Sequence, residues 1–288
     1  MSRVGFVIHE GRAEAVRAAA ALKSALGSAG VQTLDVDESA QPVELVVAVG
    51  GDGTFLRAAY VASQVGSPVL GVKVGRLGFL TEVEPPNALE LIQEALAGKA
   101  RIETRLAVVA ETETGSAFPA QWGMNEIMVE KRARHRLVRL RVEVDGSYVT
   151  TFSADGVIVA TPTGSTAYSF SARGPIVSPD VPCLIVTPIA AHMVFDRSFV
   201  LASFQVVTLE VVGDEPALVS ADGRASEEVP VGTRVRIRVS SRPAQFVRRD
   251  DGPAFLPRVR EKFDLPGNPD RDDEQNGSGS PGGVGTSA

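Results

Sequence analysis

The chain has 288 residues, of which 44% are hydrophobic and 22% are charged, a composition typical of a globular protein with room for two domains. A net charge of −6 argues against a general nucleic-acid-binding surface, and a single cysteine excludes a disulfide framework within the chain. The first residues lack the apolar core of a signal peptide, and no apolar run approaches the roughly 20 residues of a membrane helix. We therefore expect a soluble, cytoplasmic protein with neither a membrane nor a nucleic-acid partner.

The first hundred residues alternate between strand-like and helix-like segments. Short apolar runs that predict strands occupy residues 4–8, 31–36, 43–49 and 69–72. Apolar residues with helical spacing occupy residues 13–26, 54–63 and 87–96. Such alternation predicts a doubly wound parallel sheet, which binds ligands at the carboxyl ends of its strands. Residues 1–99 are therefore expected to form an α/β domain.

The most informative stretch of this region is the turn Gly50-Gly51-Asp52-Gly53. It follows a buried strand and precedes a helix, with Thr54 expected near the helix N-cap. This arrangement brings backbone N–H groups and the positive helix end close to a phosphate. The turn is neither a Walker A loop nor a Gly-x-Gly-x-x-Gly motif. Because an aspartate beside a phosphate must take a proton, orient a hydroxyl or hold a metal, Asp52 is a candidate catalytic residue. The alternative is a βα turn in which Asp52 makes only local hydrogen bonds.

A second glycine-punctuated loop, residues 73–79, follows the next predicted strand. Gly75 and Gly78 permit sharp turns, and Arg76 is placed to meet a phosphate. The alternative is a loop held by its own apolar side chains. Both glycine loops lie at the carboxyl ends of strands, so the sequence predicts that they share one edge of the sheet.

From residue 101 the pattern changes to short strand-like runs separated by turns. These runs occupy residues 101–110, 137–145, 148–153, 157–160, 205–212 and 231–239. Asp145-Gly146 predicts a hairpin, and arginines that alternate with apolar residues at 234–239 predict one solvated sheet face. Residues 100–250 are therefore expected to form an all-β domain. A terminal helix is expected at 255–265, and the composition of 266–288 predicts a disordered tail.

Two motifs of the second domain carry polar groups suited to a nucleotide. In residues 154–171, a hydroxyl-rich turn at 161–166 and a short helix fit a ribose or phosphate, and Tyr168 offers a face to a base. The alternative is a Ser/Thr-rich loop with Tyr168 in the core. Asn125-Glu126 can hydrogen-bond a base or ribose, although such pairs are more often surface residues at a strand start. The basic run 131–136 is a solvated loop or closes over phosphates.

Taken together, these motifs resemble the NAD kinases, the ATP- or polyphosphate-dependent enzymes that make NADP from NAD. The resemblance covers about residues 3–263 and is carried by the motifs at 50–54, 77–80, 125–126 and 154–171. It implies an α/β N-terminal domain and an all-β C-terminal domain with the active site between them. It also implies a homodimer or homotetramer, and a segment, 251–265, that returns to the first domain.

The resemblance assigns roles to individual residues. It implies that Asp52 is the general base facing the 2′-hydroxyl of the adenosine ribose of NAD. Gly50, Gly51, Gly53, Thr54 and Arg57 would hold phosphates. The residues expected to bind NAD are Asn125, Glu126, Arg136, Ser153, Asp155, Thr166, Ala167, Tyr168, Ser169, Phe170, Ser171, Ala190 and Arg224. No residue is expected to hold a resident metal, and Mg²⁺ would arrive on the phosphate donor.

Two positions depart from the family pattern. Lys73 stands where the family commonly has Asn, and Arg224 stands where a Gln commonly follows Asp222-Gly223. Both add a cation beside the expected pocket, which would favour a more anionic ligand or mark a divergent paralogue. The competing interpretations are a related kinase acting on a lipid or sugar hydroxyl, and a dinucleotide sensor without catalysis.

Overall fold

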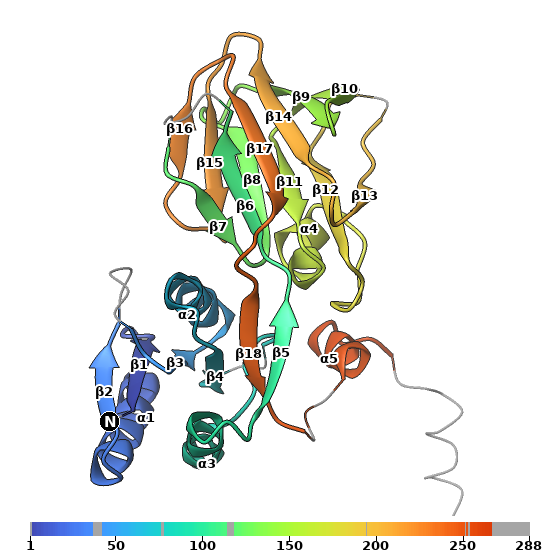
Figure 1. The fold of residues 1–288 in the computed structure, drawn as a ribbon. Coiled ribbons are helices and arrows are strands. Elements are labelled where there is room, and N and C mark those ends of the chain that lie inside the picture. The colour runs from blue at the N-terminus through green and yellow to red at the C-terminus, as the bar shows by residue number, and fades with distance from the viewer. Residues whose placement is uncertain are drawn as a thin grey trace, which may run out of the picture. The chain divides into compact units, whose positions relative to one another are not determined.

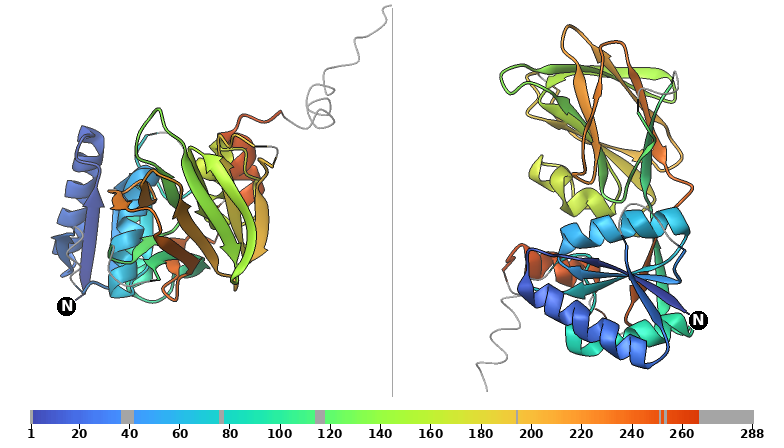
Figure 2. Two further views of the ribbon diagram at one scale, coloured as in Figure 1. Left: turned by 90° about the horizontal axis from the view of Figure 1, so that it is seen from above. Right: turned by 90° about the vertical axis from the view of Figure 1, so that its left-hand side faces the viewer.

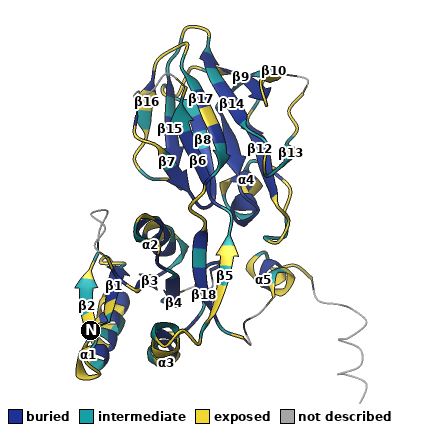
Figure 3. Cartoon of the chain, in the orientation of Figure 1, coloured by how far each residue is buried: buried dark blue, intermediate teal, exposed yellow. Residues whose placement is uncertain are grey.

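The computed structural model describes residues 2–36, 42–75, 78–113, 118–193, 195–250, 252 and 254–266. Their strands form three sheets of six strands each, and Figure 1 labels them. We call the first sheet with its helices the α/β half, and the other two sheets the β half. Figure 3 shows that buried residues follow the strands of both halves.

The α/β half contains one mixed sheet in the order β2-β1-β3-β4-β18-β5, in which only the last pair is antiparallel. Its strands are β1 (Arg3–Ile8), β2 (Gln32–Asp35), β3 (Leu45–Gly50), β4 (Val69–Lys73), β5 (Arg101–Arg105) and β18 (Ala244–Arg248). Its helices are α1 (Ala13–Ser28), α2 (Asp52–Val65) and α3 (Pro85–Leu96).

Helices cover both faces of this sheet because successive side chains of a strand point to opposite faces. Leu45, Val47 and Val49 of β3 share a buried cluster with α1 and α3. Val46 and Ala48 share another with α2. Figure 2 shows α2 on one side of the strands and the other two helices on the opposite side. The predicted doubly wound arrangement is therefore confirmed.

The beginnings of two helices differ from the sequence-based expectation. Helix α2 begins at Asp52 with Gly51 as its N-cap, so the helix starts before Thr54, the residue expected to open it. Thr54 is buried within the first turn. Helix α3 begins at Pro85 rather than Asn87, because proline fits the first turn of a helix, where its missing N–H has no intrahelical partner.

The β half is a sandwich of two antiparallel sheets, in the orders β10-β9-β14-β17-β6-β7 and β13-β12-β11-β8-β15-β16. The first contains β6 (Val108–Thr112), β7 (Gln121–Gly123), β9 (Val138–Val144), β10 (Ser147–Ala154), β14 (Val207–Val212) and β17 (Arg234–Val239). The second contains β8 (Glu126–Lys131), β11 (Gly156–Ala160), β12 (Cys183–Ile189), β13 (Phe199–Ala202), β15 (Ala217–Ala221) and β16 (Glu227–Val229). Alternate residues of both sheets, such as Leu140 and Val157, form one buried cluster between them.

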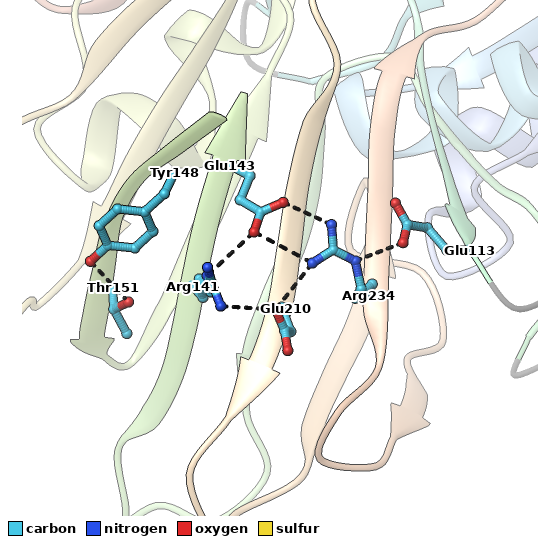
Figure 4. Close-up of polar contacts among 7 residues, drawn as sticks. All are labelled: Glu113, Arg141, Glu143, Tyr148, Thr151, Glu210 and Arg234. Carbon is cyan, nitrogen blue, oxygen red and sulfur yellow. Dashed lines mark hydrogen bonds and ion pairs between the residues drawn. The ribbon is translucent and has the colours of Figure 1, made fainter. Parts of the chain in front are cut away.

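The outer face of β9, β14 and β17 confirms the solvated stripe expected from residues 234–239. Val235 and Ile237 are buried, whereas Arg234 reaches across the sheet on the other face. Its guanidinium pairs with Glu113, Glu143 and Glu210 at 2.6, 2.7 and 3.1 Å. Figure 4 shows this network, which Arg141 extends to Glu143 and Glu210.

The run 101–110, expected as one strand of the β domain, forms two strands in different sheets. Strand β5 pairs with β18 in the α/β half, and β6 belongs to the β half. The chain therefore enters and leaves the β half through two neighbouring strands, as Figure 1 shows. The domain limits expected at residues 99 and 250 stay a prediction.

Residues from 253 onward belong to a second compact unit, in which α5 (Phe255–Lys262) confirms the expected terminal helix. The return of segment 251–265 to the first domain stays a prediction. The expected disordered tail lies, apart from Pro266, outside the described residues. Every helix among the described residues is too short or too polar to cross a lipid bilayer.

Candidate active site

The Gly50–Gly53 turn joins β3 to α2 and has space on one side. At Gly50, an added Cβ would lie 2.5 Å from the Thr54 hydroxyl oxygen, so this position accepts only glycine. At Gly51 and Gly53, an added Cβ would have no neighbour within 4 Å. The backbone beside these two glycines therefore faces open space at the positive end of α2, where an anionic group can approach.

Asp52 connects this turn to the second glycine loop. Its Oδ2 accepts a hydrogen bond from the Phe79 N–H at 2.9 Å, and its Oδ1 accepts one from the Leu80 N–H at 3.1 Å. An added Cβ at Gly78 would lie 2.1 Å from Oδ1, so only glycine lets the loop approach this closely. Each carboxylate oxygen has two lone pairs, which leaves Asp52 able to accept a further hydrogen bond. Arg76 and Leu77 lie outside the described residues.

Asn125 and Glu126 are buried at the start of β8, so they are not an ordinary surface pair. The carboxylate of Asp222 accepts hydrogen bonds from the N–H groups of Met124, Asn125 and Glu126 at 2.7, 2.8 and 3.1 Å. On the carbonyl side, the Thr161 hydroxyl donates to Met124 at 2.7 Å, and the Thr161 N–H donates to Asn125 at 2.8 Å. The segment 124–126 is therefore held from both sides.

The Glu126 carboxyl is unusual in its surroundings. It is 8% exposed, and its Oε2 has no hydrogen-bond partner within the described residues. Burial, with a further contribution from the negative charge of Asp222, raises the pKa of Glu126 to about 8. Since buried polar atoms normally have partners, this carboxyl points to a ligand that would supply one.

The block 161–171 forms the 3₁₀ helix η1 (Thr163–Thr166) and the short helix α4 (Tyr168–Ser171). Gly164 packs directly on Asn125, since an added Cβ would lie 2.1 Å from the Asn125 carbonyl oxygen. Tyr168 and Phe170 are 42% and 38% exposed, so the alternative that places Tyr168 in the core is wrong. Ser169 is buried and its hydroxyl contacts that of Thr187 at 3.1 Å.

Other residues expected from the sequence lie around the β10–β11 turn or farther out. Asp155 forms an ion pair with Lys131. The Ser153 carbonyl accepts a hydrogen bond from the His192 N–H at 2.9 Å, and Ala190 has a positive φ of 46°. Arg136 pairs with Glu215 at 3.5 Å on the surface. The binding roles of these residues stay predictions.

Arg224 lies between the two halves. Its guanidinium is 4.1 Å from the centre of the Tyr60 ring in α2, and its Nη2 donates to the Trp122 carbonyl. A cleft of about 530 Å³ lies beside it, with Arg57, Tyr60 and Glu10 among the lining residues. Lys73, the last residue of β4, pairs with Glu84 at 3.3 Å. Both departures from the family pattern thus have partners within the protein.

Helix α2 connects the glycine turn that carries Asp52 with the segment that carries Asn125 and Glu126. Phe55 and Ala58, in the turns that follow Asp52, share a buried cluster with Trp122 and Met124, which immediately precede Asn125. The catalytic candidate and the buried polar pair are therefore attached to one core. Asp222 was not among the residues expected at the site, because its only sequence signal is an Asp-Gly pair.

Comparison with known proteins identifies the family. The ATP-NAD kinase N-terminal domain matches residues 31–100, and the ATP-NAD kinase C-terminal domain matches residues 124–249. This chain belongs to the NAD kinase family. The NAD kinase of Rhodococcus erythropolis is 41% identical over 231 residues, which cover 80% of this chain and 73% of the relative. The NAD kinase of Mycolicibacterium paratuberculosis is 35% identical over an alignment of 292 residues, covering 90% and 94%.

Two solved structures share the fold. A yeast NADH kinase complexed with NADH matches with a TM-score of 0.81 at 23% identity, covering 92% of this chain and 88% of the other. An NAD kinase from Archaeoglobus fulgidus in complex with ATP matches with a TM-score of 0.71 at 27% identity, covering 91% and 97%. The predicted fold class is confirmed, with a first sheet that is mixed rather than purely parallel.

Proposed function

We propose that this chain transfers the terminal phosphoryl group of ATP, or of another phosphate donor, to the 2′-hydroxyl of the adenosine ribose of NAD. The observation that carries this proposal is the attachment of Asp52 and of the Asn125–Glu126 pair to one core. The α/β half offers a carboxylate and an open glycine turn, and the β half offers a buried polar pair. Family membership supports the choice of NAD and ATP as substrates.

In this proposal Asp52 accepts the hydrogen bond of the ribose 2′-hydroxyl with a free lone pair and orients it toward the donor. The new bond forms between the 2′-oxygen and the terminal phosphorus, while the bond to the bridging oxygen of the donor breaks. The hydroxyl proton passes to Asp52 and then to water, so NAD and ATP give NADP, ADP and one proton. The N–H groups at the open glycines stabilise charge on the transferred group.

Recognition of NAD falls to the β half. Asn125 provides amide groups, and Glu126, protonated at neutral pH, provides a hydroxyl donor and a carbonyl acceptor for NAD hydroxyl or amide groups. The exposed ring of Tyr168 provides a face for a base. Asp155, Arg57 and the other residues named from the family resemblance keep their expected roles as part of this proposal.

We propose that Mg²⁺ reaches the site on the donor phosphates, where it offsets their charge. Within the described residues, no group of three His, Cys, Asp or Glu side chains gathers to hold a metal. Asp52, the carboxylate within the glycine turn, already accepts two backbone hydrogen bonds. A homodimer or homotetramer and a cytoplasmic location also remain part of the proposal.

The test is to incubate purified protein with Mg-ATP and NAD and to follow NADP with an NADP-specific dehydrogenase. NADP formation is the expected result. Parallel incubations replace NAD by a lipid or a sugar, and a binding assay measures the Kd for NAD. Phosphorylation of lipid or sugar alone would contradict the proposal, and so would NAD binding without turnover.

A further inference from the structure

Asp222 is a turn residue whose burial ordinary turn chemistry does not explain. It follows β15 in a turn with Gly223, where both residues have a positive φ, 50° and 68°. Its side chain is fully buried. Burial raises the pKa of Asp222 above its ordinary value, and its backbone hydrogen bonds and Arg224 offset part of this rise. An aspartate in the left-handed region and in a buried site persists only when its surroundings hold it there.

Three backbone N–H groups converge on this one carboxylate. Oδ2 accepts from Met124, and Oδ1 accepts from both Asn125 and Glu126. The close approach requires Gly123, because a Cβ there would lie 3.2 Å from Oδ1 and 2.6 Å from the Glu126 carbonyl oxygen. A carboxylate offers about four lone-pair sites, whereas an amide offers one oxygen and a donor NH₂. No neutral isostere can therefore accept all three hydrogen bonds.

We propose that Asp222 is the positioning residue of the NAD site: its carboxylate fixes the backbone of 124–126 and thereby aims Asn125 and Glu126 at the dinucleotide. This inference rests on the proposed function of that pair. Asp222 itself touches no substrate in this scheme.

The same turn reaches the phosphoryl-transfer side of the molecule. Arg224, two residues after Asp222, lies against Tyr60 of α2, the helix that Asp52 begins. Its Nη1 is 3.9 Å from the Asp222 carboxylate, and its Nη2 donates to Trp122. The turn 222–224 thus ties the strand start that carries Asn125 to the helix that carries Asp52.

Asp145 provides a matched control for Asp222. It also precedes a glycine in a turn with positive φ, 50° for Asp145 and 79° for Gly146. Its carboxylate accepts from the Val206 N–H at 2.9 Å and from Gln205 at 3.0 Å, in the β9–β10 hairpin, at the opposite edge of the sheet from β7. Asp145→Asn therefore removes a turn carboxylate without touching the segment 124–126.

We expect Asp222→Asn to raise the Kd and KM for NAD by about tenfold or more, because a lost hydrogen bond to a charged group leaves a backbone N–H unpaired. The kcat should change less, since Asp52 and the glycine turn remain. Asp145→Asn should leave all three constants unchanged.

The pH dependence of NAD binding separates positioning from a merely structural role. The charge of Asp222 helps to raise the pKa of Glu126. Titration of Glu126 should give an inflection in the plot of the Kd for NAD against pH. In Asp222→Asn this inflection should move to lower pH, and in Glu126→Gln it should disappear. A folded Asp222→Asn protein with an unchanged Kd and an unmoved inflection would overturn the inference.

A second variant covers the case in which Asp222→Asn does not fold. Thr161→Val removes the hydroxyl that holds the Met124 carbonyl from the opposite side. It should also raise the Kd for NAD but leave the Glu126 inflection in place, and a wild-type Kd would then overturn the inference. If the wild-type protein makes no NADP, the proposed function fails instead. If it makes NADP and these variants bind NAD normally, only the role of Asp222 fails.

Discussion

Carboxylates have different structural roles in two regions of this protein. At the candidate site, Asp52 and Asp222 accept hydrogen bonds from backbone N–H groups of distant segments. On the outer face of the β half, Glu113, Glu143 and Glu210 share the side chain of Arg234 (Figure 4). A carboxylate that holds backbone has no substitute, whereas a member of a surface network leaves others in place. We therefore expect replacements to cost most where carboxylates hold backbone.

The largest effect is expected from Asp52→Asn. Asn cannot take the ribose hydroxyl proton, and general-base assistance contributes roughly 10²- to 10⁴-fold, so kcat should fall by about that factor. The Kd for NAD should change little, because the lost contact matters mainly in the transition state. The measurements are NADP formation at saturating substrates and titration of NAD onto the folded variant. A fall in kcat of less than about tenfold would leave Asp52 with only its structural role toward Phe79 and Leu80.

Gly78→Ala tests whether the contact between the two glycine loops matters. The new Cβ would clash with the Asp52 carboxylate, so the loop or Asp52 must move. We expect kcat to fall by about tenfold or more, since a displacement of 1 Å in a catalytic group is costly. Gly27→Ala in α1 is the control, because its Cβ meets no atom within 4 Å. Equal kcat values for the two variants would show that the loop contact is dispensable.

The contributions of the two regions to stability should depend on pH with opposite sign. Glu126→Gln tests the contribution of the buried carboxyl at the candidate site. The folded protein holds the Glu126 proton up to a pKa of about 8, against an ordinary value of 4.5, so the folded state binds more protons between these values. Stability should therefore decline as pH rises through this window, and less so in Glu126→Gln. Denaturant unfolding of both proteins at pH 5 and pH 8.5 measures the difference. An equal change in the free energy of unfolding of the two proteins between these pH values would mean that Glu126 is ionised in the folded state.

The smallest effect is expected from Arg234→Gln. Arg234 is partly exposed, and Arg141 still pairs with Glu143 and Glu210 in the variant, so the melting temperature should fall by only about 2–4 °C and kcat should stay unchanged. The hydrogen bond from Arg234 lowers the pKa of Glu143, so its contribution should be present at neutral pH and lost as the pH falls below about 4.5. The variant should therefore lose less stability on acidification than the wild type. A fall of much more than this range, or a change in turnover, would remove the contrast between the regions.

Features with a local cause could be predicted from the sequence. The Gly50–Gly53 turn follows from a strand run, a glycine cluster and a helical pattern that succeed one another directly within residues 43–63. The start of α3 also has a local cause, proline at the first helical positions, although the helix was expected to begin only at Asn87.

Features that depend on distant partners could not be predicted in this way. The N–H groups that explain Asp222 come from positions almost a hundred residues earlier. The burial of Glu126 had no signal, because glutamate is normally exposed. The pairing of β18 with β4 and β5 depends on segments from opposite ends of the chain.

The pairing of β18 also affects how the chain folds during synthesis. Strand β4 is made early, but its neighbour β18 follows the whole β half. Until then the later part of that edge of β4 is covered only by the bridge between Val72 and Val83, and the part around Val69 lacks its partner and invites association with other chains. The α/β half thus cannot complete its sheet before the β half has emerged from the ribosome. The two halves are therefore expected to unfold in denaturant as a single cooperative transition, in which the N-terminal part has no stable folded state of its own.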